Sequence, residues 1–356
     1  MANHTKIISE AYKKFNDTNT SVSANKLPHS KRCMERYWLK PEQRAKCTNA
    51  SLKAGTIGHD VVEICLNKNL SVEEVIASKE IQDKIDSYIS FDEADKMKFK
   101  FAIKFLKNTA ENHLLNFKEL PKQKWKTEIE FTTWLPKVNI FWKMFVDALG
   151  QETVVDIKYK LPTAKFAPLK TKQIKENPNR IGDWACSHPK LDARVFTSDL
   201  MQMALYSHTT GLKPALSYAS ATDRILFTED NCDELKPENL KRHLNELIAY
   251  EIAWEKKLKA ADGSVDELMW LNIPDFSDVR KKSFWWNGIP SESTTTVSGI
   301  VKPLRQRIAD LEEINKEHQK INGKLQQEVN DKNKKIEELM ERINNPLKKM
   351  RGDGDL

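Results

Sequence analysis

Residues 125–134 read WKTEIEFTTW, residues 138–149 read VNIFWKMFVDAL and residues 153–159 read TVVDIKY. All three stretches are rich in β-branched and aromatic residues, and the last two are separated by Gly150-Gln151. Short runs of this composition bounded by turn residues indicate strands. The three stretches therefore predict an antiparallel meander, with a hairpin turn centred near Gly150 and Gln151.

Helical patterns lie on both sides of this meander, as expected for an α/β fold. Helices are predicted at 21–37, 52–66, 72–88, 91–117, 199–208 and 239–258, with a further strand at 216–226. Residues 160–195 are rich in Pro and Lys and predict a long irregular connection. The expected architecture is a mixed sheet flanked by helices.

The C-terminal part has a different pattern. A polar stretch, SESTTTVSG, precedes a 4-3 spacing that is typical of a coiled-coil seam, in which four of twelve positions are polar. The seam consists of Leu304, Ile308, Leu311, Asn315, His318, Asn322, Leu325, Val329, Lys332, Ile336, Leu339 and Ile343. We expect one large globular domain at 1–290, a linker at 291–300, a self-associating coiled coil at 301–346 and a flexible tail at 347–356. A solvated single helix is the alternative to the coiled coil.

Composition sets limits on location and partners. The net charge of +7 permits a polyanionic partner without proving one. The five cysteines are scattered and form no Cys-x-x-Cys pair, which fits a reducing cytosol. No signal peptide and no apolar run of about 18 residues is visible, so a soluble cytoplasmic protein without a membrane partner is expected, in the host cytoplasm if the source is viral.

The strongest chemical signal is Asp156-Ile157-Lys158 on the third predicted strand. Residues two apart on a strand share a face, so a carboxylate and an ammonium point to one side and Ile157 is buried on the other. Such a pair can hydrolyse a phosphodiester when the carboxylate holds a divalent cation and the Lys orients water or stabilises charge. Asp147, across the hairpin, can add a second oxygen ligand for Mg²⁺ or Mn²⁺. An exposed cross-strand ion pair is the alternative.

Two helical motifs accompany this triplet. Gly55 precedes His59 by one helical turn, so a small residue could let the helix approach closely and aim the imidazole at the metal. Gln202 and Tyr206 are one turn apart and share a helix face. Taken singly, His59 could be a core histidine, and Gln202 with Tyr206 a half-buried helix edge.

Together, and in this order, these residues resemble the RecB-like branch of the PD-(D/E)XK nucleases between Ser23 and Tyr206. The resemblance also covers an opening Ser-Leu-Cys-Tyr pattern at Ser23, Leu27, Cys33 and Tyr37. It implies a restriction-endonuclease-like core in which metal is bound by His59, Asp147, Asp156 and the backbone carbonyl of Ile157. It further implies that Lys158 is catalytic and that Gln202 and Tyr206 position DNA or this Lys.

Three departures from the family pattern are visible. The strand reading KMFVD lacks the Gly that is usual before Asp147, and Tyr159 replaces the common Thr after the Asp-x-Lys. Some family members carry an iron-sulfur cluster on one early and three late cysteines; Cys33 matches the first position, whereas Cys186 and Cys232 are isolated. No iron-sulfur cluster is therefore expected. Glu130 is a candidate acidic helper, but a surface role is favoured.

A basic stretch lies between two of these motifs. From Lys158 to Arg194 there are nine Lys or Arg against three acidic residues, with Phe166 and Trp184 interspersed. Basic side chains can pair with phosphates and aromatic rings can stack on unpaired bases, although a solvated loop is the alternative. Trp285-Trp286, after Arg280-Lys281-Lys282, forms a second such patch or closes the core.

The sequence thus predicts a Mg²⁺- or Mn²⁺-dependent DNA nuclease. The resemblance favours an exonuclease of recombination, repair or replication, similar to the compact stand-alone nucleases of bacteriophages, acting on a duplex end or a single strand. A recombination protein or a single-strand-binding protein is a further expected partner. A catalytically inactive DNA-binding scaffold assembled through its coiled coil and an RNA nuclease remain as alternatives.

Overall fold

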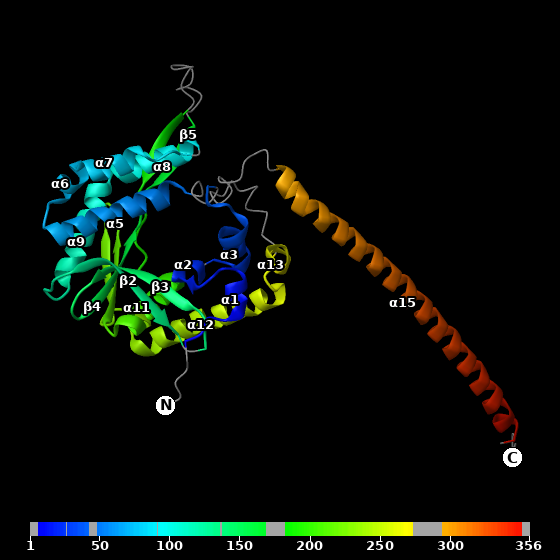
Figure 1. Ribbon diagram of the computed structural model, residues 1–356. Coiled ribbons are helices and arrows are strands. Elements are labelled where there is room, and N and C mark those ends of the chain that lie inside the picture. Colours follow the sequence, from blue (N-terminus) through cyan, green and yellow to red (C-terminus); the bar gives the residue numbers. More distant parts are fainter. Residues whose placement is uncertain are drawn as a thin grey trace, which may run out of the picture. The chain divides into compact units, whose positions relative to one another are not determined.

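The computed structural model describes residues 6–25, 27–42, 48–90, 92–135, 137–168, 182–272 and 294–350. The chain divides into two compact units, Met1–Gly288 and Ile289–Leu356. In the first unit, helices flank both faces of a mixed β-sheet (Figure 1). This confirms the expected α/β class. None of the helices within the described residues is both long enough and apolar enough to cross a bilayer.

The central sheet has six strands in the order β1-β3-β4-β7-β8, with β2 also paired to β3. The strands are β1 (Asn19–Thr20), β2 (Lys126–Trp134), β3 (Phe141–Leu149), β4 (Thr153–Tyr159), β7 (Lys213–Ala219) and β8 (Arg224–Thr228). The pairs β2–β3 and β3–β4 are antiparallel, so the predicted meander is confirmed, and β4–β7 is parallel. The further strand expected at 216–226 is in fact the antiparallel pair β7–β8.

Two apolar clusters, one on each face, hold the helices on this sheet. The helices of the first unit are α1 (Glu10–Lys14), α2 (Val22–Asn25), α3 (His29–Cys33), α5 (Ala50–Lys68), α6 (Val72–Ala77), α7 (Lys79–Asp86), α8 (Glu93–Lys104), α9 (Leu106–Glu119), α11 (Thr197–Thr210), α12 (Pro237–Ala261) and α13 (Val265–Leu271), with a π-helix η1 (Met34–Trp38) and a 3₁₀ turn η2 (Asp233–Leu235). Helices α5 and α9 cover one face, and α11 with α12 covers the other. Ile157 is buried in the cluster under α5 and α9, as predicted, and Val154 is buried in the cluster under α11 and α12.

The helical stretches at 72–88 and 91–117 are each interrupted. Ser78 ends α6 and caps α7 through a hydrogen bond from the Ile81 amide, because a Ser side chain can satisfy an amide at a helix start. Phe105 separates α8 from α9. The helix predicted at 52–66 is α5, which Asn49 caps in the same way.

The expectation of an irregular connection at 160–195 is wrong in part. Strands β5 (Thr163–Pro168) and β6 (Gly182–Ser187) form an antiparallel pair outside the central sheet. Phe166 and Trp184 are cross-strand partners with ring centroids 5.3 Å apart. Cross-strand aromatic pairs stabilise an otherwise exposed ribbon, and this pair compensates for the missing hydrophobic alternation.

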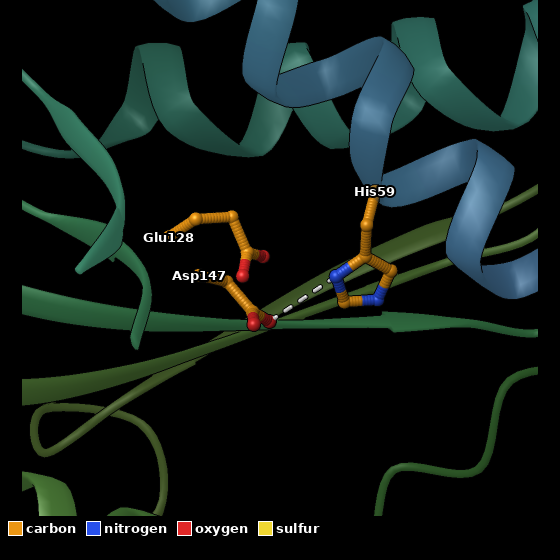
Figure 2. Close-up of side chains that lie close together, drawn as sticks. All are labelled: His59, Glu128 and Asp147. Atoms are coloured by element: carbon orange, nitrogen blue, oxygen red, sulfur yellow. Dashed lines mark ion pairs between the residues drawn. The ribbon is translucent and has the colours of Figure 1, made fainter. Parts of the chain in front are cut away.

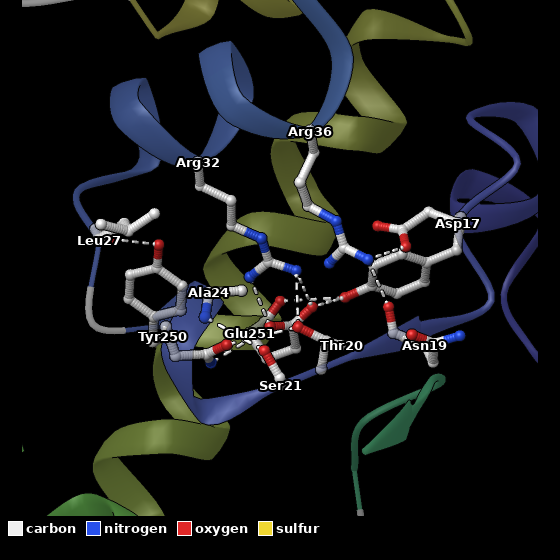
Figure 3. A network of polar contacts seen from close by, with 12 residues as sticks. Asp17, Asn19, Thr20, Ser21, Ala24, Leu27, Arg32, Arg36, Tyr250 and Glu251 are labelled. Carbon is white, nitrogen blue, oxygen red and sulfur yellow. Dashed lines mark hydrogen bonds and ion pairs between the residues drawn. The ribbon is translucent and has the colours of Figure 1, made fainter. Parts of the chain in front are cut away.

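A buried polar network fixes the N-terminal segment to α12 (Figure 3). Arg32 and Glu251 form a fully buried ion pair in which the two nitrogen–oxygen distances are 2.6 and 2.9 Å. The Tyr12 hydroxyl donates to Glu251 at 2.6 Å, and the Trp254 ring lies 4.6 Å from the Arg32 guanidinium. Removing one partner would leave a buried charge, which costs about 3–5 kcal/mol. The predicted helical segment at 21–37 is therefore an anchored part of the fold.

In the second unit, residues Thr294–Met350 form one helix, α15. The expected linker at 291–300 is therefore helical from Thr294, and the expected tail at 347–356 is helical to Met350. Apolar residues of the predicted seam, such as Leu325 and Ile336, are about half exposed on this helix (53% and 52%). Their exposure leaves an apolar stripe available for a partner.

Candidate active site

The strands β3 and β4 separate soon after their hairpin. Their ladder comprises two residue pairs, the second being Ala148↔Val155. Beyond it, the Ile157 amide donates to the Asp147 carboxylate at 2.7 Å. Because buried backbone groups need hydrogen-bond partners, this carboxylate replaces the missing ladder bond. Asp147 is thereby held in the gap between the strands.

The Tyr206 side chain provides a hydrogen bond to the backbone of β3, the other strand that borders this gap. The Phe145 carbonyl accepts a hydrogen bond from the Tyr206 hydroxyl, and that hydroxyl also accepts from Gln202 Nε2 at 2.6 Å. Tyr206 is buried against the sheet, and burial raises its pKa well above the ordinary value. The phenol is therefore neutral, and it ties α11 to β3.

His59, Glu128 and Asp147 gather above this gap (Figure 2). His59 comes from α5, and its Nδ1 lies 3.5 Å from a carboxylate oxygen of Asp147. One ligand atom from each of the three residues lies within 4.8 Å of the others, and within the described residues this is the one such group of three or more His, Cys, Asp or Glu side chains. An imidazole nitrogen and two carboxylates form a donor set that fits a Mn²⁺ or Mg²⁺ ion.

Glu128 reaches this group through an unusual backbone conformation. It lies between the pairs Thr127↔Ala148 and Ile129↔Val146, which places it opposite Asp147. Its φ is +49°, in the left-handed region that non-glycine residues rarely adopt. Like charges facing each other across a sheet destabilise it. Both the conformation and the charge pairing are costs that binding of a cation could offset.

The electrostatic environment tunes two of the three groups. Burial, followed by the charge of Lys158, lowers the pKa of His59 to about 4. The imidazole is therefore neutral near pH 7, which is the form that binds metals. Desolvation, followed by the charge of Asp147, raises the pKa of Glu128 to about 7.

Asp156 and Lys158 lie on the opposite face of β4 from Ile157, as the strand period predicts. The Lys158 ammonium lies 2.5 Å from an Asp156 carboxylate oxygen, and the Asp156 side chain is fully buried. Gln202 bridges the pair, because its Nε2 donates to Asp156 at 2.8 Å and its Oε1 accepts from Lys158 at 3.2 Å. Gln202 thus orients both charged groups.

Burial opposes the positive charge of Lys158, but neighbouring carboxylates outweigh it. Asp156, Asp147 and Asp199 together raise the pKa of Lys158 above its ordinary value. The side chain is therefore an ammonium at neutral pH, and 22% of its surface remains exposed. A charged, oriented donor next to a gap between strands can stabilise negative charge that develops on a phosphate.

Tyr159, the departure from the family pattern, packs against α5. Its hydroxyl donates to the Gly58 carbonyl at 2.6 Å, and its ring lies 5.5 Å from the His59 ring and 4.4 Å from the buried His113 ring. A Cβ at Gly58 would lie 2.5 Å from two Tyr159 ring carbons, whereas a Cβ at Gly55 would have no atom within 4 Å. The close approach expected at Gly55 is therefore wrong: Gly58 provides it.

The structure brings the predicted residues together in two groups. His59 and Asp147 join Glu128, whereas Asp156 lies with Lys158, Gln202 and Tyr206. The Ile157 amide links the groups through Asp147. Sequence reasoning missed Glu128. It shares an alternating strand face with Glu130, and only the register between β2 and β3 distinguishes the two.

Glu130 has the surface position that was favoured for it, because it is about half exposed and pairs with Lys143 at 2.9 Å. Cys33 is buried with its sulfur 3.2 Å from that of Met269, and burial raises its pKa to about 12. The central part of the basic stretch, 169–181, and the patch at 280–286 lie outside the described residues.

The chain matches no protein-family model and no curated protein sequence. Among solved structures it is similar to one titled "Crystal structure of SSO0001", with 12% sequence identity and a TM-score of 0.28. The match covers 67% of this chain and 83% of that chain. A likeness this weak carries no argument about fold or function.

Proposed function

We propose that this chain is a Mn²⁺- or Mg²⁺-dependent DNA nuclease of the RecB-like PD-(D/E)XK type. The observation that carries the proposal is the placement of His59, Glu128 and Asp147 around one point, linked through the Ile157 amide to a buried Asp156–Lys158 pair. Metal ligands beside an oriented ammonium suit hydrolysis of a phosphodiester.

His59, Glu128 and Asp147 would hold the cation, with Asp156 and the Ile157 carbonyl as the further ligands that the resemblance implies. A bound cation supplies an activated water and neutralises charge. Lys158 holds a positive charge for the phosphate oxygens, and Gln202 fixes its direction through the bond at 3.2 Å. Tyr206 keeps Gln202 in place. These side chains are preorganised, so little rearrangement accompanies the reaction.

Exonuclease action follows from the resemblance, and so does a role in recombination, repair or replication. A linear end-labelled DNA and a circular single strand of the same sequence separate the two modes of cleavage. Release of labelled mononucleotides from the linear DNA, with the circle intact, is the expected result. Cleavage of the circle at a comparable rate would identify an endonuclease instead.

The principal test compares degradation of DNA and RNA with and without Mn²⁺. Lys158→Ala alone would leave the buried Asp156 carboxylate without its ammonium counter-charge, so the double variant Asp156→Asn/Lys158→Met, which removes both charges, is the better probe. We expect it to fold, as judged by circular dichroism, and to lose at least about 10²- to 10³-fold in rate. Glu130→Gln, at the exposed ion pair, is the control and should keep the wild-type rate.

Each other outcome identifies an alternative. Degradation of RNA in preference to DNA would make the chain an RNA nuclease. Binding of DNA without degradation by the wild type would indicate a DNA-binding scaffold. Equal degradation by the wild type and the double variant would refute the proposed site.

A further inference from the structure

An exposed aromatic side chain lies beside the candidate site. Phe196 immediately precedes α11, and 52% of its surface is exposed. The Lys160 ammonium lies 4.3 Å from the centre of the Phe196 ring and 4.1 Å from that of Tyr218. The two rings are 6.4 Å apart and inclined by only 27°. The Lys160 ammonium thus lies over one face of an exposed ring.

Buried polar groups support this arrangement. The Tyr218 hydroxyl donates to the carboxylate of Asp199, and it accepts from the Phe196 amide at 3.4 Å. Tyr218 and Asp199 are both buried, at 1% and 6% exposure. The buried Tyr218 hydroxyl therefore holds the backbone of Phe196 in place, while the Phe196 ring is about half exposed to solvent. A fixed ring loses little conformational entropy when a ligand stacks on it.

The position relative to the site suggests what stacks there. Lys160 follows Lys158 by two residues, just past the end of β4, and its amide donates to the Ala219 carbonyl at 2.8 Å. Phe196 precedes Gln202 by six residues, so the two positions are about 9 Å apart along the helix axis at 1.5 Å per residue. At the rise of about 3.4 Å per nucleotide of a stacked strand, two or three nucleotides span that distance, and fewer suffice in a more extended single strand. A strand whose phosphate meets Lys158 can therefore place a nearby base on Phe196.

We propose that Phe196 and Lys160 form a subsite for an unpaired nucleotide of single-stranded DNA, with the base stacked on Phe196 and Lys160 close to the adjacent phosphate. The inference rests on the proposed nuclease function for the place of the scissile phosphate. Phe offers no hydrogen bonds, so the subsite accepts any base. The substrate class is then DNA with a single-stranded end.

The test measures DNA binding without cleavage. Fluorescence anisotropy in Ca²⁺ follows a labelled single strand and a series of the same strand with one abasic residue at successive positions. One or two abasic positions should weaken binding to the wild type. Phe196→Ala should weaken binding of the intact strand by about 5- to 150-fold, with no further loss when the abasic residue occupies the position that Phe196 contacts. Phe196→Trp should restore the affinity.

Trp270→Ala is the matched control, because it truncates an aromatic side chain that is 36% exposed on α13. We expect no change in affinity. Wild-type affinity of Phe196→Ala for the intact strand, or an equal loss at every abasic position, would overturn the subsite. Tighter binding of the matching RNA would overturn the assignment to DNA.

Cleavage in Mn²⁺ separates this inference from the proposed function. If the chain shows the Phe196-dependent abasic pattern but cuts nothing, the nuclease proposal fails and the subsite stands. If the chain cuts DNA and Phe196→Ala changes neither affinity nor rate, the subsite fails alone. If the wild type neither binds nor cuts single-stranded DNA, the subsite fails, and the nuclease proposal fails with it when duplex DNA also stays intact.

Discussion

Gly58→Ala adds a single methyl group at the point where α5 meets β4. The new Cβ would lie 2.5 Å from Tyr159 Cε1 and Cζ, whereas carbon atoms in contact prefer roughly 3.5–4.0 Å. The ring is packed between α5 and the His113 ring, so α5 must retreat by about 1 Å. The hydrogen bond from the Tyr159 hydroxyl to the Gly58 carbonyl would then lengthen or break.

The expected cost combines these effects. Overpacking of a well-packed interior costs about 1–3 kcal/mol, and a lost hydrogen bond costs about 1 kcal/mol. The greater helix propensity of Ala compared with Gly offsets about 1 kcal/mol of this destabilisation. We therefore expect a free energy of unfolding that is lower by about 1–3 kcal/mol in Gly58→Ala. Because His59 is the next residue, Mn²⁺ affinity should fall, and a displacement of about 1 Å can reduce the rate about 10²-fold.

Urea unfolding, calorimetric titration with Mn²⁺ and the rate of DNA cleavage measure these three effects. Gly55→Ala is the matched control on the same helix, where a Cβ meets nothing within 4 Å. It should keep Mn²⁺ affinity and be neutral or more stable. Tyr159→Thr, which removes the ring, should reduce the cost of Gly58→Ala in a double-mutant cycle. Equal stability and Mn²⁺ affinity of the two alanine variants would refute the reasoning.

Three other predictions concern separate parts of the chain. Glu128→Gln should weaken Mn²⁺ binding about 10-fold or more in calorimetric titration, and equal weakening by the exposed Glu130→Gln would remove Glu128 from the site. Burial, with the charges of nearby cations, lowers the pKa of His29 from 6.5 to about 4. The stability that neutral His29 contributes is therefore fully present above pH 6.5, and the free energy of unfolding in urea should fall towards pH 4 by up to about 1.4 kcal/mol per pH unit. The same slope in His29→Phe would exclude His29 as the cause. Leu325→Glu/Val329→Glu in the full chain should dissociate an oligomer in sedimentation velocity, whereas a monomeric wild type would exclude self-association through α15.

Local pattern was sufficient to predict the elements that carry the site. The meander was predictable because β-branched and aromatic runs were bounded by turns, and the facing of Asp156 and Lys158 followed from the strand period alone. The helix at Gln202 and Tyr206 was predictable in the same way. In each case, the interacting residues are close in sequence, so tertiary contacts had little to add.

The pair β5–β6 could not be predicted from hydrophobic period. Its residues are mostly exposed or half exposed, and cross-strand pairing of Phe166 with Trp184 takes the place of a buried face. The helical start of α15 was obscured in the same way, because Thr294–Gly299 has the composition of a polar linker. Composition indicates how much apolar surface a segment can bury. The pair β5–β6 does not form by burying much apolar surface, and Thr294–Gly299 has little apolar surface to bury, so composition did not predict them.

The candidate metal-binding group His59, Glu128 and Asp147 depends on features that are not local in sequence. Glu128 and Glu130 have the same chemistry and the same alternating phase, and the β2–β3 register decides which one faces Asp147. The left-handed backbone at Glu128 has no signature in the sequence, since such conformations favour Gly, Asn or Asp. A strained conformation is kept only when the surrounding structure imposes it, and such strain gathers at functional sites. The residue that local rules identify least well is therefore the one on which the proposed cation site depends most.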